Sequence, residues 1–222
     1  MKETRKIVIV GDSAFAEIAY EYFKADGYAI AAFSVEKKYL TKDSLFGVPV
    51  VPFETLTDFY DPEEHLVFVA IVYTKLNRLR SRLAGAAKAK GYKLASYISK
   101  DARVWPNAKI GEHCFIFENN VIQPFVEIGD NVILWSGNHI GHHSKVMNNC
   151  FIASHVVISG FTEIGENSFL GVNTTVSNNI MIGKDNWIGP GITLTKDTEE
   201  GALFGPTEAK ASKVKAPRFF KV

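Results

Sequence analysis

The hydrophobic positions in the second half of the chain recur at every sixth residue. From Ile98 to Leu194 each of these positions is Ile, Leu or Val, without a break. The series is Ile98, Val104, Ile110, Ile116, Ile122, Ile128, Leu134, Ile140, Val146, Ile152, Ile158, Ile164, Leu170, Val176, Ile182, Ile188 and Leu194. Such a period fits neither an α-helix, at about 3.6 residues, nor a simple strand, at about 2. It predicts a hexapeptide β-helix.

A longer period of eighteen residues supports this architecture. Five similar segments begin at Ile110, Ile128, Val146, Ile164 and Ile182, each eighteen residues after the last. Three hexapeptides then make one triangular coil, and we expect about five coils without an interrupting loop. In four of the five segments the second residue is Gly, which suits a tight corner where backbone freedom matters more than a side chain.

An aromatic and aliphatic stripe runs one place before the inward series. Its members, also eighteen residues apart, are Phe115, Ile133, Phe151, Phe169 and Trp187. Because the neighbouring aliphatic residues point inward, this stripe is predicted to point outward. An apolar stripe of this size marks a contact surface. We interpret it as a subunit interface; the alternative is a cover formed by the chain's own N-terminal part or tail.

The first hundred residues follow a different pattern, in which strands and helices alternate. Apolar runs predict strands at residues 6–10, 28–35, 48–51, 65–72 and 92–98, and helical periodicity covers residues 12–23 and 75–90. Asp12 or Ser13 offers an N-cap for the first helix. This alternation predicts a small parallel α/β sheet leading directly into the repeat.

Composition and charge narrow the classes of partner. The chain has 222 residues, a hydrophobic fraction of 46% and a formal charge of +1, so we expect a soluble protein without affinity for nucleic acid or membranes. No targeting or membrane-spanning segment is recognisable, which predicts a cytoplasmic location. Cys114 and Cys150 are thirty-six residues apart, about 9 to 10 Å in stacked coils, beyond disulfide reach. Both are interpreted as buried fillers.

The turn after the first strand is the candidate anion site. The following helix offers free N–H groups at the carboxyl edge of the sheet, where a phosphate binds well. Gly11 stands alone, however, and the G-x-G-x-x-G pattern of dinucleotide binders is absent, which argues against NAD. Two interpretations stay open: Gly11, Asp12 and Ser13 bind the diphosphate of a nucleotide-linked substrate, or they form an ordinary turn.

The combination resembles the bacterial sugar acyltransferases, which include nucleotide-amino-sugar N-acetyltransferases and sialic acid O-acetyltransferases. The resemblance extends from the Gly11 turn through the hexapeptides to the segment Phe204-Gly-Pro-Thr-Glu-Ala-Lys210, which is similar to the family's terminal Gly-x-Pro-Ala-Lys loop with one extra residue. It implies a Rossmann-like nucleotide-sugar-binding domain over 1–97, a left-handed parallel β-helix acyltransferase domain over 98–196, and a C-terminal loop and tail over 197–222. It also implies a homotrimer with active sites between neighbouring β-helices.

Candidate chemistry lies in a bend that contains His139, His142 and His143. Transfer from a thioester needs a group that takes a proton from the attacking amine or hydroxyl, and imidazole titrates in the right range. The family's catalytic histidine follows the pattern Ile-Glu-His-Glu, and this chain has Ile140-Gly-His-His. The resemblance therefore makes His142 the general base, with His143 in the place of a carboxylate. The alternative is that these histidines are solvent-exposed corner residues with no catalytic role.

The resemblance also implies a binding site for acetyl-CoA along the groove between two β-helices. Gly160, one coil beyond His142, is a candidate backbone donor to the thioester carbonyl. Asn178 and the Gly205–Pro206 loop are candidates for binding pantetheine and adenosine. Hexapeptide β-helices also include zinc enzymes of the γ-carbonic anhydrase type, but their His-x4-His pair has no counterpart here, so no metal is expected.

The predicted function is acetyl-CoA-dependent N-acetylation of a UDP- or dTDP-linked amino-dideoxy sugar in the synthesis of bacterial surface glycans such as lipopolysaccharide. Transfer is expected to be direct, with no covalent enzyme intermediate. Two alternatives stay open at this point: O-acetylation of a sugar, and a non-catalytic β-helix scaffold.

Overall fold

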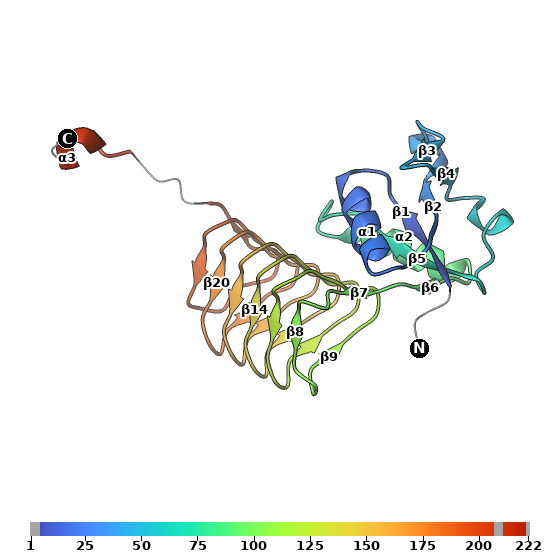
Figure 1. The fold of residues 1–222 in the computed structure, drawn as a ribbon. Coiled ribbons are helices and arrows are strands. Elements are labelled where there is room, and N and C mark those ends of the chain that lie inside the picture. Colours follow the sequence, from blue (N-terminus) through green and yellow to red (C-terminus); the bar gives the residue numbers. More distant parts are fainter. Residues whose placement is uncertain (1–4, 207–210, 221–222) are drawn as a thin grey trace.

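A computed structural model describes residues 5–206 and 211–220 of the chain. Residues 5–95 form one α/β layer (Figure 1). The elements are β1 (Lys6–Val10), α1 (Ala14–Ala25), β2 (Ile30–Val35), β3 (Ser44–Leu45), β4 (Val48–Pro52), β5 (His65–Val69), α2 (Arg78–Ala89) and β6 (Lys93–Leu94), with 3₁₀ turns at Lys37–Tyr39 and Leu56–Asp58. The six strands form one sheet in the order β3-β4-β2-β1-β5-β6, parallel except for the β3–β4 pair. The predicted α/β sheet is therefore present.

The two helices cover opposite faces of this sheet because successive residues of a strand point to opposite sides. Ile7 and Ile9 of β1 pack in one cluster with Phe15 and Phe23 of α1. The alternate residues of β1 pack in a second cluster, which holds the buried face of α2. The sheet is thus a buried layer between two helices, as a parallel sheet requires.

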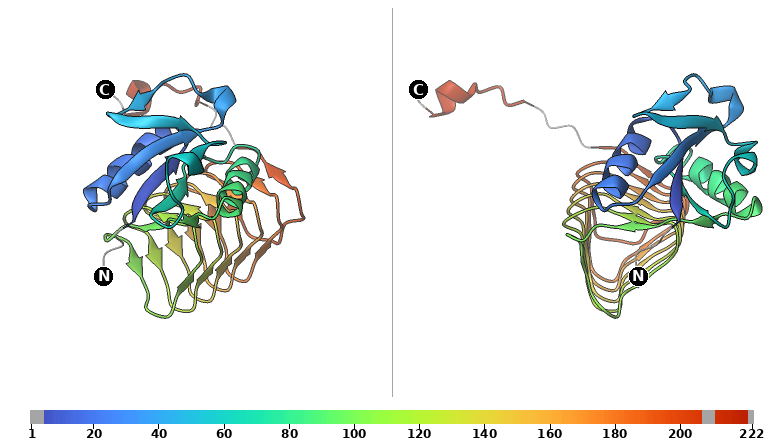
Figure 2. Two further views of the ribbon diagram at one scale, coloured as in Figure 1. Left: turned by 90° about the vertical axis from the view of Figure 1, so that its right-hand side faces the viewer. Right: turned by 45° about the vertical axis from the view of Figure 1, so that its right-hand side comes forward.

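The rest of the chain forms a β-helix whose coils stack as three sheets of two-residue strands (Figure 2). The covered sheet contains β7 (Tyr97–Ile98), β10 (Phe115–Ile116), β13 (Ile133–Leu134), β16 (Phe151–Ile152), β19 (Phe169–Leu170), β22 (Trp187–Ile188) and β24 (Leu203–Phe204). The second sheet contains β8 (Arg103–Val104), β11 (Val121–Ile122), β14 (His139–Ile140), β17 (Val157–Ile158), β20 (Thr175–Val176) and β23 (Thr193–Leu194). The third sheet contains β9 (Lys109–Ile110), β12 (Glu127–Ile128), β15 (Lys145–Val146), β18 (Glu163–Ile164) and β21 (Met181–Ile182). The coils pair in parallel with an eighteen-residue register, for example Phe115 with Ile133, which confirms the predicted repeat.

The corners between the sheets have a regular backbone. One residue of nearly every hexapeptide adopts a left-handed conformation, and Asn occupies several of these positions, such as Asn131 with φ 60° and Asn173 with φ 58°. Asn tolerates this region better than most residues. The glycines in the second place have another reason: a Cβ on Gly165 would lie 2.5 Å from the backbone nitrogen of Lys184 in the next coil. Close approach of coils, rather than backbone freedom, requires glycine there.

The apolar stripe on the outside of the covered sheet is buried beneath the chain's own α/β layer. Phe115 is fully buried and Phe169 is 7% exposed. The ring of Phe15 from α1 lies 5.6 Å from that of Phe115, and Tyr73, after β5, lies 4.7 Å from Phe169. The prediction that this stripe is a subunit interface is therefore wrong, and the alternative, a cover from the chain's own N-terminal part, is confirmed.

A buried polar joint also connects α2 to the first coils. Arg80 is fully buried, and its guanidinium donates to the backbone oxygens of Val69, Asn131 and His113 at 3.0, 2.7 and 2.8 Å, and to the side chain of Asn131. Val69 N–H in turn donates to Nε2 of His113 at 2.9 Å. Nδ1 of His113 lies 2.8 Å from the Asn131 side-chain oxygen, so this nitrogen carries the proton.

These contacts correct the fold class predicted from the sequence. A Rossmann-like domain followed by a left-handed β-helix was expected, but no separate Rossmann-like N-terminal domain is present. One continuous hydrophobic cluster contains Ile7 and Phe68 of the α/β layer together with Phe115, Ile133 and Phe169 of the β-helix. The structure is a stack of parallel coils whose covered sheet shares its outer core with the α/β layer.

The described part of the C-terminal tail extends away from the coils (Figure 1). It contains the short helix α3 (Ala216–Phe220), whose side chains are all exposed. Part of the closing segment named in the sequence, residues 207–210, lies outside the described residues. Among the residues that the structure describes, no helix is long and apolar enough to cross a bilayer.

Candidate functional site

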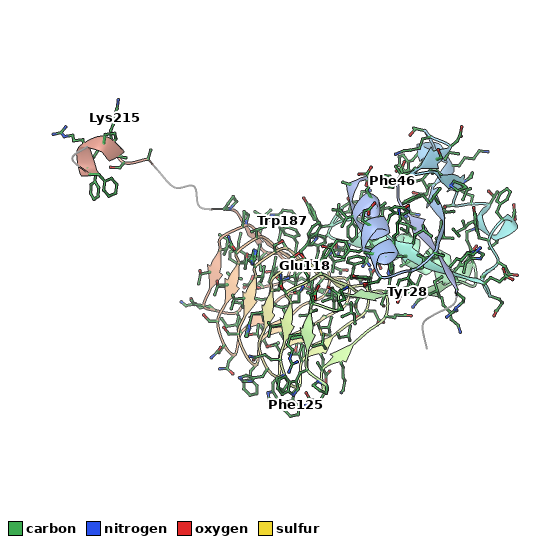
Figure 3. The ribbon with its side chains drawn as sticks, viewed as in Figure 1. Tyr28, Phe46, Glu118, Phe125, Trp187 and Lys215 are labelled. Atoms are coloured by element: carbon green, nitrogen blue, oxygen red, sulfur yellow. The ribbon has the colours of Figure 1, made fainter. Side chains whose placement is uncertain are left out.

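The histidine bend lies on the edge of the β-helix farthest from the α/β layer. Residues 141–144 connect β14 of the second sheet to β15 of the third sheet, whereas the α/β layer covers the remaining sheet. In Figure 3, Phe125, which stacks on His143, lies at this outer edge, while Glu118 and Trp187 lie toward the layer. The bend is thus an exposed corner between two sheets that residues 5–206 and 211–220 leave uncovered.

His142 is exposed but well positioned. Its backbone N–H donates to the side-chain oxygen of Gln123 in the preceding coil at 2.8 Å. Its ring lies directly over Gly160, where an added Cβ would be 2.8 Å from Cε1 and 3.0 Å from Nε2. The ring of Phe161 packs edge-on against it, with centroids 5.1 Å apart. A side chain at position 160 would therefore displace the imidazole.

His143 lies between two phenylalanine rings. Phe125 stacks on one side at 4.5 Å and Phe161 on the other at 4.8 Å, with interplanar angles of 25° and 15°. All three residues have left-handed backbones at equivalent corners of successive coils. Nδ1 of His143 lies 3.2 Å from Nδ1 of His142, so the two imidazoles share one hydrogen bond.

The residues predicted to bind the thioester are only partly brought together. His142, Gly160 and Asn178 occupy the same corner in three successive coils, Gly160 being buried and Asn178 exposed. Gly205 and Pro206 follow β24 of the covered sheet, and Pro206 lies over Gly189 at a different corner. Within one chain, the Gly205–Pro206 loop therefore does not form a continuous site with His142, whereas Asn178 lies on the same corner.

The Gly11–Ser13 turn opens into a cavity of about 240 Å³ at the carboxyl end of β1. Gly11 has φ +123°, and a Cβ there would be 2.8 Å from the backbone oxygen of Ala70, so glycine is required. Ser13 is the N-cap of α1 but makes no capping hydrogen bond with its side chain. Asp12 forms an ion pair with Lys42 at 3.3 Å. The N-terminus of α1 and the Lys42 ammonium favour binding of an anion in this cavity, whereas the Asp12 carboxylate disfavours it.

The other four histidines do not cluster with His142 and His143. His139 is half-buried on the second sheet, and His155 lies at the corner that adjoins the covered sheet. His65 and His113 are buried within or beneath the α/β layer. Burial and then the charge of Arg80 hold the pKa of His113 well below its usual value. Across residues 5–206 and 211–220, no group of three or more His, Cys, Asp or Glu is arranged to hold a metal ion.

Comparisons with known proteins connect this geometry to a class of enzyme. A family model described as the GMPPB C-terminal domain matches residues 93–202, and no curated protein matches. A mutant of perosamine N-acetyltransferase from Caulobacter crescentus, solved with CoA and GDP-perosamine, is 27% identical, with a TM-score of 0.83 over 92% of this chain and 95% of that one. The acetyltransferase domain of PglB from Neisseria gonorrhoeae, solved with acetyl coenzyme A, is 26% identical, with a TM-score of 0.82 over 94% and 99%. Over nearly its whole length the chain is therefore similar to bacterial sugar N-acetyltransferases with a hexapeptide β-helix.

The similarity to these solved acetyltransferases includes the α/β layer and the coils together. WeeI from Acinetobacter baumannii, at 17% identity, has the same fold with a TM-score of 0.71 over 90% of the chain. Because each match runs through at least nine-tenths of the chain, the layer is part of the family fold rather than a separate Rossmann-like unit.

Sequence reasoning missed three side chains of the histidine corner: Gln123, Phe125 and Phe161. Their contacts with the histidines are described above. A signal was present for two of them, because residues 125, 143 and 161 are spaced by eighteen, and the stacking rule predicts that they form one column. Gln123 contacts His142 at a spacing of nineteen, which the repeat does not predict.

Proposed function

We propose that the chain transfers the acetyl group of acetyl-CoA to the amine of a nucleotide-linked amino sugar, with His142 as general base. The observation that carries this proposal is the position of His142: an exposed imidazole held against Gly160 and Gln123 at an uncovered corner. The relatives solved with CoA, acetyl coenzyme A and GDP-perosamine support the two substrates.

In the proposed reaction, Nε2 of His142 takes a proton as the sugar amine attacks the thioester carbonyl. The carbon–nitrogen bond forms, the carbon–sulfur bond breaks, and CoA leaves as the thiol or thiolate. Gly160 leaves room for the imidazole and, as proposed, its backbone N–H stabilises the oxyanion. Asn178 lies next along the same corner, where it would contact the pantetheine arm. No covalent enzyme intermediate is needed.

The nucleotide part of the acceptor is proposed to bind at residues 11–13, the turn between β1 and α1. That turn belongs to the α/β layer, which covers one sheet, and His142 lies on the edge opposite to that sheet. One chain therefore cannot bring the two together. A homotrimer, in which a neighbour contributes His142 or the Gly205–Pro206 loop, would complete the site.

The decisive experiment measures CoA thiol release from acetyl-CoA with UDP-, dTDP- and GDP-linked amino sugars and their hydroxyl counterparts. We expect turnover with an amino sugar, and a loss of kcat of at least about 10²-fold in His142→Ala, the usual contribution of a general base. Size-exclusion chromatography with light scattering serves as the control for assembly.

Two results would contradict the proposal. Turnover only with a hydroxyl acceptor would replace N-acetylation by O-acetylation. Full activity of correctly assembled His142→Ala would remove His142 from the reaction.

A further inference from the structure

The pair of imidazoles at the corner allows two placements of the shared proton. The Nδ1 atoms are 3.2 Å apart, so one nitrogen donates and the other accepts. If His142 donates from Nδ1, its Nε2 keeps a lone pair and can act as a base. If His143 donates, the neutral His142 carries its proton on Nε2 and cannot accept another there.

We propose that His143 is a positioning residue that accepts the Nδ1–H of His142, and that Phe125 and Phe161 hold it in place for this role. The proposal rests on the proposed function, since it concerns the tautomer of the base. In it, a neutral imidazole replaces the carboxylate that the resemblance places after the catalytic histidine.

The aromatic column supplies the rigidity that this role needs. With both faces of His143 covered by phenyl rings at 4.5 and 4.8 Å, only the edge of the imidazole is open to polar contacts. Rotation of the ring out of this stack would lose both aromatic contacts. The Nδ1 edge of His143 is therefore directed at His142.

The column also holds the base itself. Phe161 stacks on His143 and packs edge-on against His142 at 5.1 Å, so one side chain contacts both rings. His142 is further confined by Gly160 beneath it and by its backbone hydrogen bond to Gln123. When Nε2 of His142 takes a proton, its Nδ1–H stays donated to His143, and the positive charge is stabilised without any move of the rings.

The chain provides matched substitutions for position 143, whose backbone has φ 59°. Phe is accommodated at the same corner position in two neighbouring coils, with φ 63° at Phe125 and 56° at Phe161. His143→Phe therefore keeps the backbone and the stack but removes the acceptor. Asp is accommodated at Asp185, with φ 59°, so His143→Asp keeps the backbone and supplies a carboxylate acceptor in place of the ring.

The kinetic test compares these two variants with the wild type in the CoA-release assay. We expect His143→Phe to lose kcat by about 10- to 100-fold with little change in KM for acetyl-CoA, because a misoriented base affects the chemical step. His143→Asp should recover most of this loss. Equal losses in both variants, or full activity of His143→Phe, would overturn the proposal.

A spectroscopic test reads the tautomer independently of turnover. With only six histidines in the chain, ¹⁵N-histidine labelling and long-range ¹H–¹⁵N correlation can assign the His142 ring, with His142→Ala identifying its signals. We expect a protonated Nδ1 and an unprotonated Nε2 at neutral pH in the wild type, and loss of this preference in His143→Phe.

A protonated Nε2 on His142 in the wild type would overturn the proton placement even if His142→Ala is inactive. Conversely, an active His142→Ala together with the expected tautomer would reject His142 as the base but leave the hydrogen bond as assigned. The two proposals can therefore fail separately.

Discussion

At the scale of single residues, the site depends on the absence of a side chain as much as on the presence of one. Gly160 is buried beneath the His142 ring, and its φ lies outside the left-handed region. Its role is therefore one of space: the imidazole occupies the volume that a Cβ would need. The contacting atoms belong to an exposed side chain rather than to the backbone, so the fold can accommodate a methyl group that would displace the imidazole of the proposed base.

Gly160→Ala is accordingly predicted to separate activity from stability. The new Cβ would be 2.8–3.1 Å from three atoms of the His142 ring, so the ring must shift, and kcat should fall by at least about 10-fold, as for other misplaced catalytic groups. The melting temperature should change by no more than a few degrees, since the backbone is compatible with alanine. Gly85→Ala in α2, where an added Cβ meets nothing within 4 Å, is the matched control and should retain full activity. A normal kcat in Gly160→Ala would show that His142 works from another position.

At the scale of elements, the polar joint between α2 and the first coils decides how the α/β layer is attached. Arg80 has no carboxylate among the partners described above; it donates to three backbone carbonyls and one amide oxygen. Burial lowers its pKa to about 9, which still leaves it charged at neutral pH. A charged Arg80 in turn disfavours a proton on His113, so the joint requires a neutral imidazole whose Nε2 accepts from Val69.

This joint predicts a loss of stability in acid. Because the pKa of folded His113 is lowered, the unfolded chain binds a proton below about pH 6.5 that the folded chain does not bind. The contribution is fully present above that pH and decreases as the pH falls, with a limiting slope of about 1.4 kcal/mol per pH unit. His113→Asn removes the titrating group, and Asn131, at the equivalent position of the next coil, shows that Asn adopts the left-handed backbone required there.

Urea unfolding of the wild type and His113→Asn between pH 5 and 8, at one protein concentration, tests this expectation. The variant should be less stable at pH 8 by about 1–3 kcal/mol, the cost of leaving the buried Val69 N–H without its acceptor. The difference between the two proteins should then narrow on acidification. If the two free energies of unfolding differ by the same amount at every pH, the lowered pKa of His113 does not contribute to the pH dependence of stability.

At the scale of the whole molecule, the two halves of the proposed site lie on opposite sides of the coil stack. The Gly11–Ser13 cavity belongs to the α/β layer, and His142 lies at the corner between the two uncovered sheets. The apolar stripe that the sequence predicted to be a subunit interface is covered by the α/β layer of the same chain. In the proposed homotrimer, a neighbouring chain would therefore approach one of the uncovered faces, which include the half-exposed Val121 and Val157 beside His139.

Subunit complementation tests this arrangement. Ser13→Trp should fill the cavity of about 240 Å³ without removing a helix cap, because Ser13 makes no side-chain cap. His142→Ala removes the proposed base. Each variant alone should be inactive, whereas a mixture unfolded and refolded together should recover a fraction of the wild-type rate, since some sites combine an intact Ser13 with an intact His142. No recovery from a mixture that forms hybrid oligomers would place both halves of the site in one chain.

The sequence by itself determined the β-helix, because a period of six with an eighteen-residue repeat forces equivalent residues to stack, whatever their surroundings. The same register placed His142, Gly160 and Asn178 on one corner and made Cys114 and Cys150 buried thiols. The alternation of strands and helices before residue 98 likewise follows from local patterns of apolar residues.

Only the tertiary structure decided what covers each face. A pattern of apolar residues tells which side of a strand avoids water, but not which partner excludes it, so Phe115 and Phe169 suggested a second subunit and instead pack against Phe15 and Tyr73. The same holds for the expected separate Rossmann-like domain, since a shared core depends on contacts between residues distant in sequence. The buried joint at Arg80 was hidden for that reason: it depends on side chains that meet across coils and layers, and its energy arises from distance and burial rather than from local sequence.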